Sequence, residues 1–412
     1  MITGNENLQS IAEKTPGLIA IFEKQGLGGY FKPENLSKIG RFIKLDTVLK
    51  SSGIDAKQFI ELLNHHVEPQ EKTYTGGSIS DIQHQLHFMA MLPCGLQNAF
   101  KDFLETHIVA NKERYEGLNY LTEGNVNHEL SYYPLLDTIT SPGELPDIII
   151  ASDVNNFFHR PFVERFINKG IFETYAPYTP NAFMEKVGYS DPSGHYTMLT
   201  ANFLVMAVDK SRLGGRKMPE CWEDILHPEF ENDIIMRGEE DFFCNAVILP
   251  LYKDQGLDAV KLLAHTIREG RHPAEMVKLA DSGKNGAATI YIMPYFFAKR
   301  IKNSNVQIVW PTDGAITSPV FMLVKKTAME TQRHLLEFLL SRETGEVLSK
   351  RLFPSVHPDV DNSHFPGSAK WLGWDFLSQN DIGKLKKDIQ EIFMLEWSKN
   401  HSKSLKSKNQ GV

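Results

Sequence analysis

The sequence predicts an α/β fold that follows a small all-α domain, and three observations carry this prediction. From residue 86 onward, short apolar strands alternate with helical segments. Residues 1–67 show apolar side chains at helical spacing and no strand signal. Residues 68–85, which lie between these two regions, are polar and contain Gly76-Gly77, a composition that is typical of a linker.

The composition fits a cytosolic type of globular protein with more than one domain. The chain has 412 residues, more than the roughly 150 that one domain usually needs. Its 42% hydrophobic and 23% charged residues exclude a largely disordered chain or a disulfide scaffold. The net charge of −7 argues against general binding to nucleic acid or anionic lipid. The three cysteines, Cys94, Cys221 and Cys244, are far apart in the sequence, which suits a reducing compartment.

The first ten residues are polar and lack the apolar run of a secretory signal. No stretch approaches the roughly 18 apolar residues that a membrane span needs. We therefore expect a cytoplasmic protein without a membrane span, or a periplasmic or extracellular one where the given start has been trimmed. No metalloprotease, nucleophile-elbow or nucleotide-binding motif is present, and we expect no cofactor.

The N-terminal domain is predicted from helix start and stop signals. Thr15-Pro16 is typical of a helix start, and Gly26 of its end. Asp46 and Asp55 are candidate N-caps of two further helices. About seventy residues bury little area, so this domain is expected to be marginal by itself.

The alternation in the rest of the chain predicts a parallel sheet with crossover helices. The polar stretch Asn400–Val412 predicts a frayed terminus. The predicted strands are Leu86–Leu92, Asn119–Thr122, Pro146–Ala151, Phe203–Val208, Asp233–Met236, Ala287–Ile292, Val306–Trp310 and Val320–Val324, and the predicted helices are Leu96–Val109, Tyr133–Ile139, Phe162–Asn168, Ala259–Ile267 and Gln332–Leu340.

Several segments occur in an order that resembles a known family. They are Leu92-Pro93-Cys94-Gly95, the strand Pro146–Ala151, the tract Pro219–Pro228 of the form P-x-x-W-x-D-[IL]-x-x-P, the segment Ala287–Phe297, and the helix that contains Phe338-Leu339-Leu340-Ser341. Residues 86–355 thereby resemble the type II periplasmic-binding-protein core of ABC-transporter extracellular solute-binding proteins, nearest to their ferric-iron branch. Residues 1–67 resemble a short helical domain of unknown function that is fused to assorted bacterial proteins.

The resemblance implies two lobes joined by a hinge, with the ligand in the cleft between them. Residues 86–199 and 315–398 would form lobe 1, and residues 200–314 lobe 2. It also implies a non-catalytic solute-binding protein whose partner is an ABC transporter or, in the cytoplasm, a regulatory protein.

Strand-to-helix turns direct free backbone N–H groups into such a cleft, which favours a small anionic or carboxylate ligand. The residues that we expect to line the cleft all follow a strand or lie in a crossing strand. They are Cys94, Gly95, Gly124, Asn125, Ser152, Asp153, Thr200, Asn202, Glu240, Met293 and Tyr295.

One departure from the ferric-iron branch leaves open whether the chain binds a metal ion. Those relatives carry adjacent tyrosines, whereas Pro294-Tyr295-Phe296-Phe297 offers one. Ferric iron prefers several anionic oxygens. Tyr295 with Asp153 or Glu240 would therefore need an accompanying anion or another carboxylate, so a small anion or organic acid is the favoured ligand.

Two alternative functions follow from other residues. An enzyme on the same scaffold would use Cys94 as nucleophile, because a helix N-terminus favours the thiolate, or Asp153 as base. We favour instead the interpretation that Cys94 is a small buried residue of a Pro-Cys-Gly turn. A protein-interaction scaffold would use residues 1–67 to bind its partner.

Overall fold

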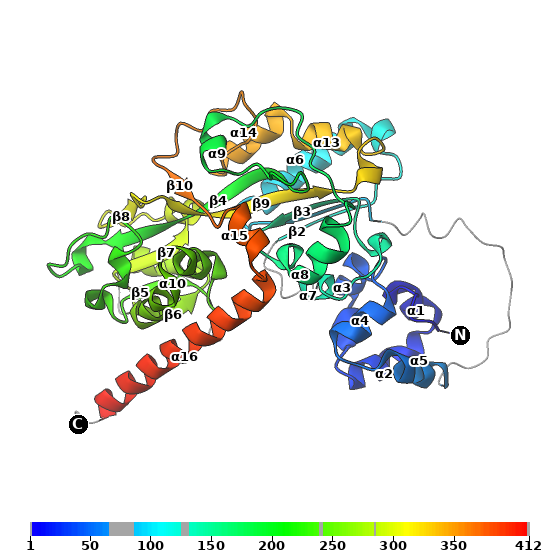
Figure 1. The fold of residues 1–412 in the computed structure, drawn as a ribbon, viewed down its shortest axis with the longest axis horizontal. Coiled ribbons are helices and arrows are strands. Elements are labelled where there is room, and N and C mark those ends of the chain that lie inside the picture. The colour runs from blue at the N-terminus through cyan, green and yellow to red at the C-terminus, as the bar shows by residue number, and fades with distance from the viewer. Residues whose placement is uncertain (1, 66–85, 125–131, 239–241, 284–285, 410–412) are drawn as a thin grey trace. The chain divides into compact units, whose positions relative to one another are not determined.

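The computed structural model describes residues 2–65, 86–124, 132–238, 242–283 and 286–409, without the side chains of 58, 61, 65 and 402–409 (Figure 1). The predicted linker 68–85 and the candidates Asn125 and Glu240 lie outside these residues. The chain forms two compact units: unit 1 contains Met1–Tyr175, Ser193–Thr197 and Met322–Glu337, and unit 2 contains Ala176–Pro192, Met198–Phe321 and Phe338–Val412. This division differs from the expected lobes, whose boundaries remain a prediction.

Unit 1 begins with the N-terminal helical module, which we define as residues 2–65. Its hydrophobic core includes Phe22, whose ring centroid lies 4.2 Å from that of Phe31. Gly26 has φ 75°, as expected for a residue that ends a helix. The helices are α1 (Leu8–Lys14), α2 (Ile19–Lys24), α3 (Pro33–Lys38), α4 (Leu45–Ser51) and α5 (Ala56–His65).

One predicted cap in this module is wrong. Lys44 is the N-cap of α4, and Asp46 lies in its first turn. An acidic residue is favourable there because it faces the positive end of the helix dipole.

The sheet of unit 1 is parallel, as predicted. Its strands are β1 (Phe88–Leu92), β2 (Tyr120–Gly124) and β3 (Ile148–Ser152), in the order β2-β1-β3. Every residue of β1 and β3 is buried, which explains their continuous apolar sequences. The associated helices are α6 (Gln97–Ala110), α7 (Tyr132–Leu136) and α8 (Arg160–Phe162), and α13 (Arg333–Leu339) begins in this unit.

The sheet of unit 2 is mixed, so the prediction of a parallel sheet is wrong for this unit. Strand β4 (Thr197–Asp209) is antiparallel to β7 (Ile290–Pro294) and to β8 (Val306–Val309). Strand β5 (Ile234–Arg237) is parallel to β7 and to the outer strand β6 (Ile267–Arg271), and β10 (Ala369–Lys370) is parallel to β9 (Ala315–Val324). The chain passes between the units within two of these strands, after Thr197 in β4 and after Phe321 in β9.

The helices of unit 2 include one that is longer than predicted. Helix α10 (Asn245–Thr266) begins well before the predicted Ala259 and contains a non-helical residue, Gly256, with φ 76°. The others are α9 (Ala182–Lys186), α11 (Pro273–Ser282), α12 (Tyr295–Ala298), α14 (Arg342–Lys350), α15 (Trp374–Gln379) and α16 (Ile382–Asn409).

The frayed terminus predicted for Asn400–Val412 is wrong for residues 400–409, because α16 continues to Asn409. Asn400 is 6% exposed, and its amide donates to the His265 carbonyl oxygen at 3.1 Å. The α16 backbone packs against α10 (Figure 1). The packing could not be predicted from the polar sequence, because only a few side chains of α16 take part in it. The fully buried Phe393 is one of them.

The tract Pro219–Pro228 forms a compact turn around Trp222 and Asp224. The indole Nε1 of the fully buried Trp222 donates to the Gly314 carbonyl oxygen at 2.9 Å. One carboxylate oxygen of Asp224 accepts from the backbone N–H groups of Glu220 (2.7 Å) and Cys221 (3.1 Å). The tract is therefore conspicuous in the sequence for a structural reason.

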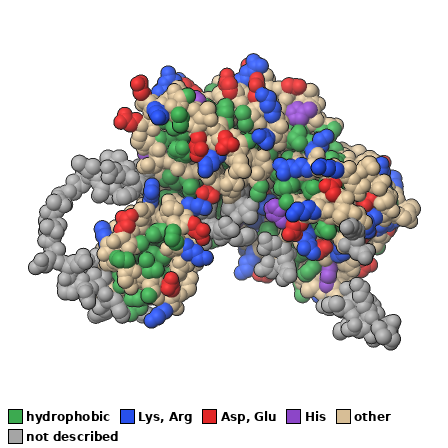
Figure 2. Space-filling model, turned by 180° about the vertical axis from the view of Figure 1, so that it is seen from behind, with side chains coloured by type: hydrophobic (Ala, Val, Ile, Leu, Met, Phe, Trp, Pro, Cys, Tyr) green, Lys and Arg blue, Asp and Glu red, His purple; other side chains and the backbone are tan. Residues whose placement is uncertain are grey.

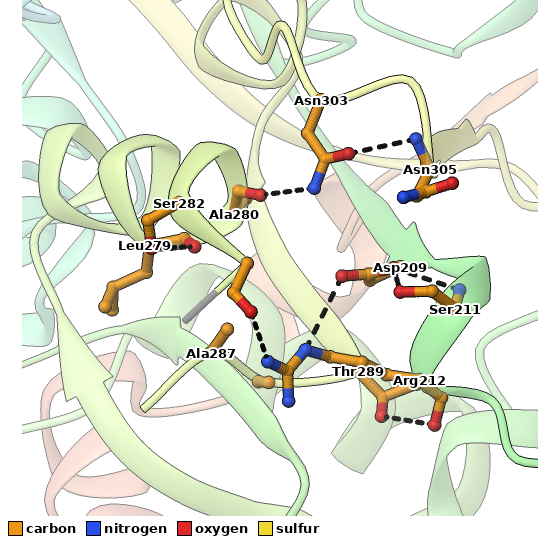
Figure 3. A network of polar contacts seen from close by, with 12 residues as sticks. Asp209, Ser211, Arg212, Leu279, Ala280, Ser282, Ala287, Thr289, Asn303 and Asn305 are labelled. Atoms are coloured by element: carbon orange, nitrogen blue, oxygen red, sulfur yellow. Dashed lines mark hydrogen bonds and ion pairs between the residues drawn. The ribbon is translucent and has the colours of Figure 1, made fainter. Parts of the chain in front are cut away.

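A polar network fixes the end of β4 and the start of β7 (Figure 3). The Arg212 guanidinium lies 3.5 Å from the Asp209 carboxylate and donates to the Gly283 carbonyl oxygen at 2.8 Å. The Thr289 hydroxyl donates to the Arg212 carbonyl oxygen at 3.2 Å. Because β7 begins at Ile290 and ends at Pro294, this network lies at the end of the strand opposite to Tyr295.

Within the described ranges, no helix is both long and apolar enough to cross a membrane. On the face drawn in Figure 2, acidic and basic side chains are interspersed.

Candidate functional site

The strand ends of unit 1 bring five of the predicted site residues to one edge of its sheet. Leu92, the last residue of β1, pairs with Gly124, the last residue of β2. Ser152 ends β3, and its hydroxyl donates to the Met91 carbonyl oxygen at 3.5 Å. Cys94 and Gly95 follow β1 directly, and Asp153 follows β3. Whether these residues contact a ligand remains a prediction.

Cys94 is exposed and lies in a turn that precedes α6. The first helical residue is Gln97 and the N-cap is Leu96, so the thiol is not at the cap of the helix. The expectation of a small buried turn residue is therefore wrong for Cys94. By contrast, Cys244 is buried and Cys221 half-buried.

The loop after β3 is held by its own side chains. Asp153 adopts a left-handed backbone conformation with φ 69°, which few residues other than glycine, asparagine and aspartate adopt. Its carboxylate accepts from the backbone N–H of Val154 at 2.8 Å. The buried Asn155 donates to the Ser152 carbonyl oxygen at 3.0 Å and accepts from the Phe157 N–H at 2.9 Å. The loop is thus preorganised, with the Asp153 carboxylate as its only charge.

Two residues that the sequence did not single out lie at this edge. A Cβ atom on Gly124 would be 2.6 Å from Oε1 of Gln97, so the Gln97 amide lies directly against the end of β2. Burial and the negative charge of Asp153 raise the pKa of Tyr133 far above its ordinary value, against the opposing effect of hydrogen bonds with Asn155 and Ser152. The Tyr133 phenol is therefore a protonated donor beside Asp153.

In unit 2, two of the four described candidates have fully buried side chains. The Thr200 hydroxyl donates to the Pro354 carbonyl oxygen at 2.5 Å, and Met293 is inside the sheet. Asn202 is 7% exposed. Because Leu204 pairs with Pro294, Asn202 and Tyr295 belong to the same end of the β4–β7 pair.

Tyr295 belongs to an aromatic cluster, which we define as Phe183, Phe203, Tyr295, Trp310 and Phe365. The Tyr295 ring centroid lies 5.3 Å from Trp310 and 6.3 Å from Phe365. Phe203 lies 5.1 Å from Trp310 and 5.3 Å from Phe365. Burial raises the pKa of Tyr295, so its hydroxyl is also protonated at neutral pH.

A pocket of about 440 Å³ lies beside this cluster and shares Phe183 and Phe365 with it. Asp359 and Asp361 contribute carboxylates to its lining. The Asp361 carboxylate accepts from the backbone N–H and the hydroxyl of Ser363, and these hydrogen bonds lower its pKa. No motif in the sequence predicted this pocket.

The described part of the chain contains no group of three or more His, Cys, Asp or Glu side chains that could hold a metal ion. Glu240, one of the acidic candidates, lies outside it.

The comparisons with known proteins point to one family. Residues 143–380, more than half of the chain, match the family described as bacterial extracellular solute-binding protein. No curated protein matches the chain.

Three solved structures illustrate the likeness in fold. A ferric binding protein from Campylobacter jejuni is 16% identical with a TM-score of 0.51, covering 77% of this chain and 99% of that chain. A Trichodesmium protein (IdiA, FutA) in complex with iron and citrate is 15% identical with a TM-score of 0.53, covering 76% and 99%. The periplasmic binding protein AfuA of Actinobacillus pleuropneumoniae, with fructose-6-phosphate bound, is 16% identical with a TM-score of 0.51, covering 76% and 98%. The expected periplasmic-binding-protein fold is thereby confirmed.

Proposed function

Because the chain belongs to the family of bacterial extracellular solute-binding proteins, which are non-catalytic, we propose that it binds a small anionic or carboxylate solute, free or associated with a metal, for an ABC transporter. The family match over residues 143–380 is the observation that carries this proposal. It supports action outside the cytoplasm, in place of the cytoplasmic location expected from the first ten residues.

The solute contacts that we propose are neutral hydrogen-bond donors at the strand ends. In unit 1 they are the Gln97 amide, the Tyr133 hydroxyl and the backbone of Gly95 and Gly124. Unit 2, taken by itself, offers the Tyr295 hydroxyl as a donor of the same kind. The raised pKa values of both tyrosines support this role, because a protonated phenol donates a hydrogen bond to an anion whereas a phenolate repels it.

A metal-associated solute is supported by a different set of groups. One structural neighbour is described as a ferric binding protein, and another as a complex with iron and citrate. In this chain the Asp153 carboxylate is the charge that suits a cation, and an anion such as citrate would supply further oxygen ligands. Phenols with raised pKa values must release protons to bind a metal, so direct iron binding would strengthen as the pH rises.

The test is calorimetry and thermal denaturation with citrate, inorganic phosphate, ferric citrate and ferric ion alone. We expect at least one anion to bind and raise the melting temperature. Two variants distinguish a free anion from a metal-associated one. Tyr295→Phe should lower the affinity for a free anion about tenfold, and Asp153→Asn should lower only the affinity for ferric citrate. Tyr252→Phe, in α10, is the matched control. Binding of none of these probes would reject the proposed ligand class.

A further inference from the structure

The N-terminal helical module is fastened to the sheet portion of unit 1 by a buried carboxylate. Glu144 is 2% exposed, and its Oε2 atom accepts from the Thr47 hydroxyl at 2.5 Å and from the Lys44 backbone N–H at 3.4 Å. Burial of a carboxylate is costly unless hydrogen bonds satisfy it, so this contact specifies one arrangement of the two surfaces.

The same surfaces meet at two neighbouring points. The Thr138 hydroxyl lies 3.3 Å from the Thr47 carbonyl oxygen and 2.9 Å from that of Leu135, and its single hydrogen is shared between them. The Phe42 ring packs edge-on against Tyr132, with centroids 5.9 Å apart. Residues 42–47 of the module therefore hold the segment 132–144, which contains α7 and the turn that precedes β3.

Helix α7 connects this contact to the candidate site. Tyr132 faces the module, whereas the next residue, Tyr133, interacts with Asp153, Asn155 and Ser152. Successive residues of a helix point about 100° apart, so one short helix can serve both sides. Any shift of α7 relative to the module would move the Tyr133 hydroxyl relative to the loop after β3.

A second contact reaches the end of β2. The Lys38 ammonium of α3 lies 3.2 Å from the Glu123 carboxylate, one residue before Gly124. Both side chains are about one-quarter exposed, so the pair is partly protected from water. The module thus contacts the segments on both sides of the gap between β2 and α7.

We infer that the N-terminal helical module is a positioning domain for the solute site of unit 1, with Thr47 and Glu144 as its anchor and Lys38 and Glu123 as its second attachment. This inference rests on the proposed function of the strand ends. Thr47, Glu144 and Lys38 act through α7 and β2, and they are positioning residues that do not touch the solute.

The direct test needs no ligand. Hydrogen exchange of the full chain reports the amides of Phe157 and Phe158, which donate to Asn155 in the loop after β3. Thr47→Val removes the donor to Glu144 and should accelerate exchange at these amides about tenfold. Thr47→Ser keeps the hydroxyl and should restore the original rate. Lys101→Met, which removes an exposed ion pair on α6, should leave it unchanged.

A second measurement uses a probe anion and a surface variant that keeps the fold. Citrate and inorganic phosphate are titrated into Lys38→Met, Glu123→Gln and the double variant. Non-additive losses of affinity, several-fold in each single variant, are expected because the two residues act as a pair.

The outcomes separate this inference from the proposed function. If Thr47→Val lowers the melting temperature while exchange at Phe157 and Phe158 stays at the original rate, the module only adds stability and the inference is overturned. If neither anion binds the original protein, the proposed ligand class falls, and the exchange experiment still decides the role of the module.

Discussion

The phenol ring of Tyr295 stands edge-on to the indole ring of Trp310, with an interplanar angle of 88° and 5.3 Å between centroids. The indole is itself fixed, because its Nε1 donates to the Ser368 carbonyl oxygen at 2.6 Å. The direction of the Tyr295 hydroxyl therefore depends on Trp310, the residue that follows β8. Such edge-to-face pairs add about 1 kcal/mol beyond area burial.

Trp310→Leu should consequently weaken solute binding as well as the fold. Loss of the ring and its hydrogen bond is expected to lower the free energy of unfolding by about 2 kcal/mol, less than for a fully buried tryptophan. Trp374→Leu is a matched control, because Trp374 is also half-buried and donates to a carbonyl oxygen, that of Tyr189. Equal losses of anion affinity in both variants would contradict a specific role for Trp310.

Gly124→Ala should reduce solute affinity with almost no loss of stability. The new Cβ atom would meet only the end of the Gln97 side chain, which can rotate away at a cost below about 1 kcal/mol. The displaced amide would then leave its place at the end of β2. Titration of Gly124→Ala against Gln97→Ala checks this, since the two variants should lose similar affinity and the double variant no more than either.

Asp224→Ala should destabilise the fold by about 1 kcal/mol at neutral pH, as loss of a capping side chain does. Burial raises the pKa of Asp224, but the N–H groups of Glu220 and Cys221 outweigh it and bring the pKa below the ordinary 3.8. The stabilisation is therefore fully present above about pH 4 and is lost as the pH falls through the lowered pKa. Denaturant unfolding at pH 7 and pH 3 checks the sign: the difference from the original protein should shrink in acid.

Lys325→Met should be among the most destabilising single changes in unit 1. The Lys325 ammonium is 3.2 Å from the Asp147 carboxylate and also donates to the Leu145 carbonyl oxygen. Removing it leaves a buried carboxylate without its cation, which typically costs about 3–5 kcal/mol. The double variant Lys325→Met/Asp147→Leu should recover much of this loss, and a double variant as unstable as the single one would show that the ion pair is not the cause.

The central strands could be predicted because a strand that is buried on both faces has a continuous apolar sequence. Ile148-Ile149-Ile150 and Ile290-Tyr291-Ile292 are continuous apolar runs, and both became strands. The strand Ile267–Arg271 could not be predicted in this way. It is an outer strand with only one fully buried residue, so its sequence is mostly polar.

The candidate site was predictable to the level of strand ends and no further. Cys94, Gly124 and Asp153 follow predicted strands, and the parallel sheet brings them to one edge. Tyr133 could not be found because its partner Asp153 is twenty residues away at no regular spacing, and their meeting depends on how α7 packs. The sequence indicated Gln97 only through its position, since it is the first residue of a helix that follows a strand.

The outermost strand of unit 2 is covered by the last helix of the chain. The indole Nε1 of Trp397 donates to the Ile267 carbonyl oxygen at 3.0 Å. A ring nitrogen of His401 lies 2.7 Å from the Arg268 carbonyl oxygen. An uncovered strand of this kind can recruit further chains by edge-to-edge pairing. Chains shortened to end before Trp397 should therefore self-associate and precipitate, although they retain every residue that we propose to contact the solute. The last helix thus protects the protein from aggregation through this strand.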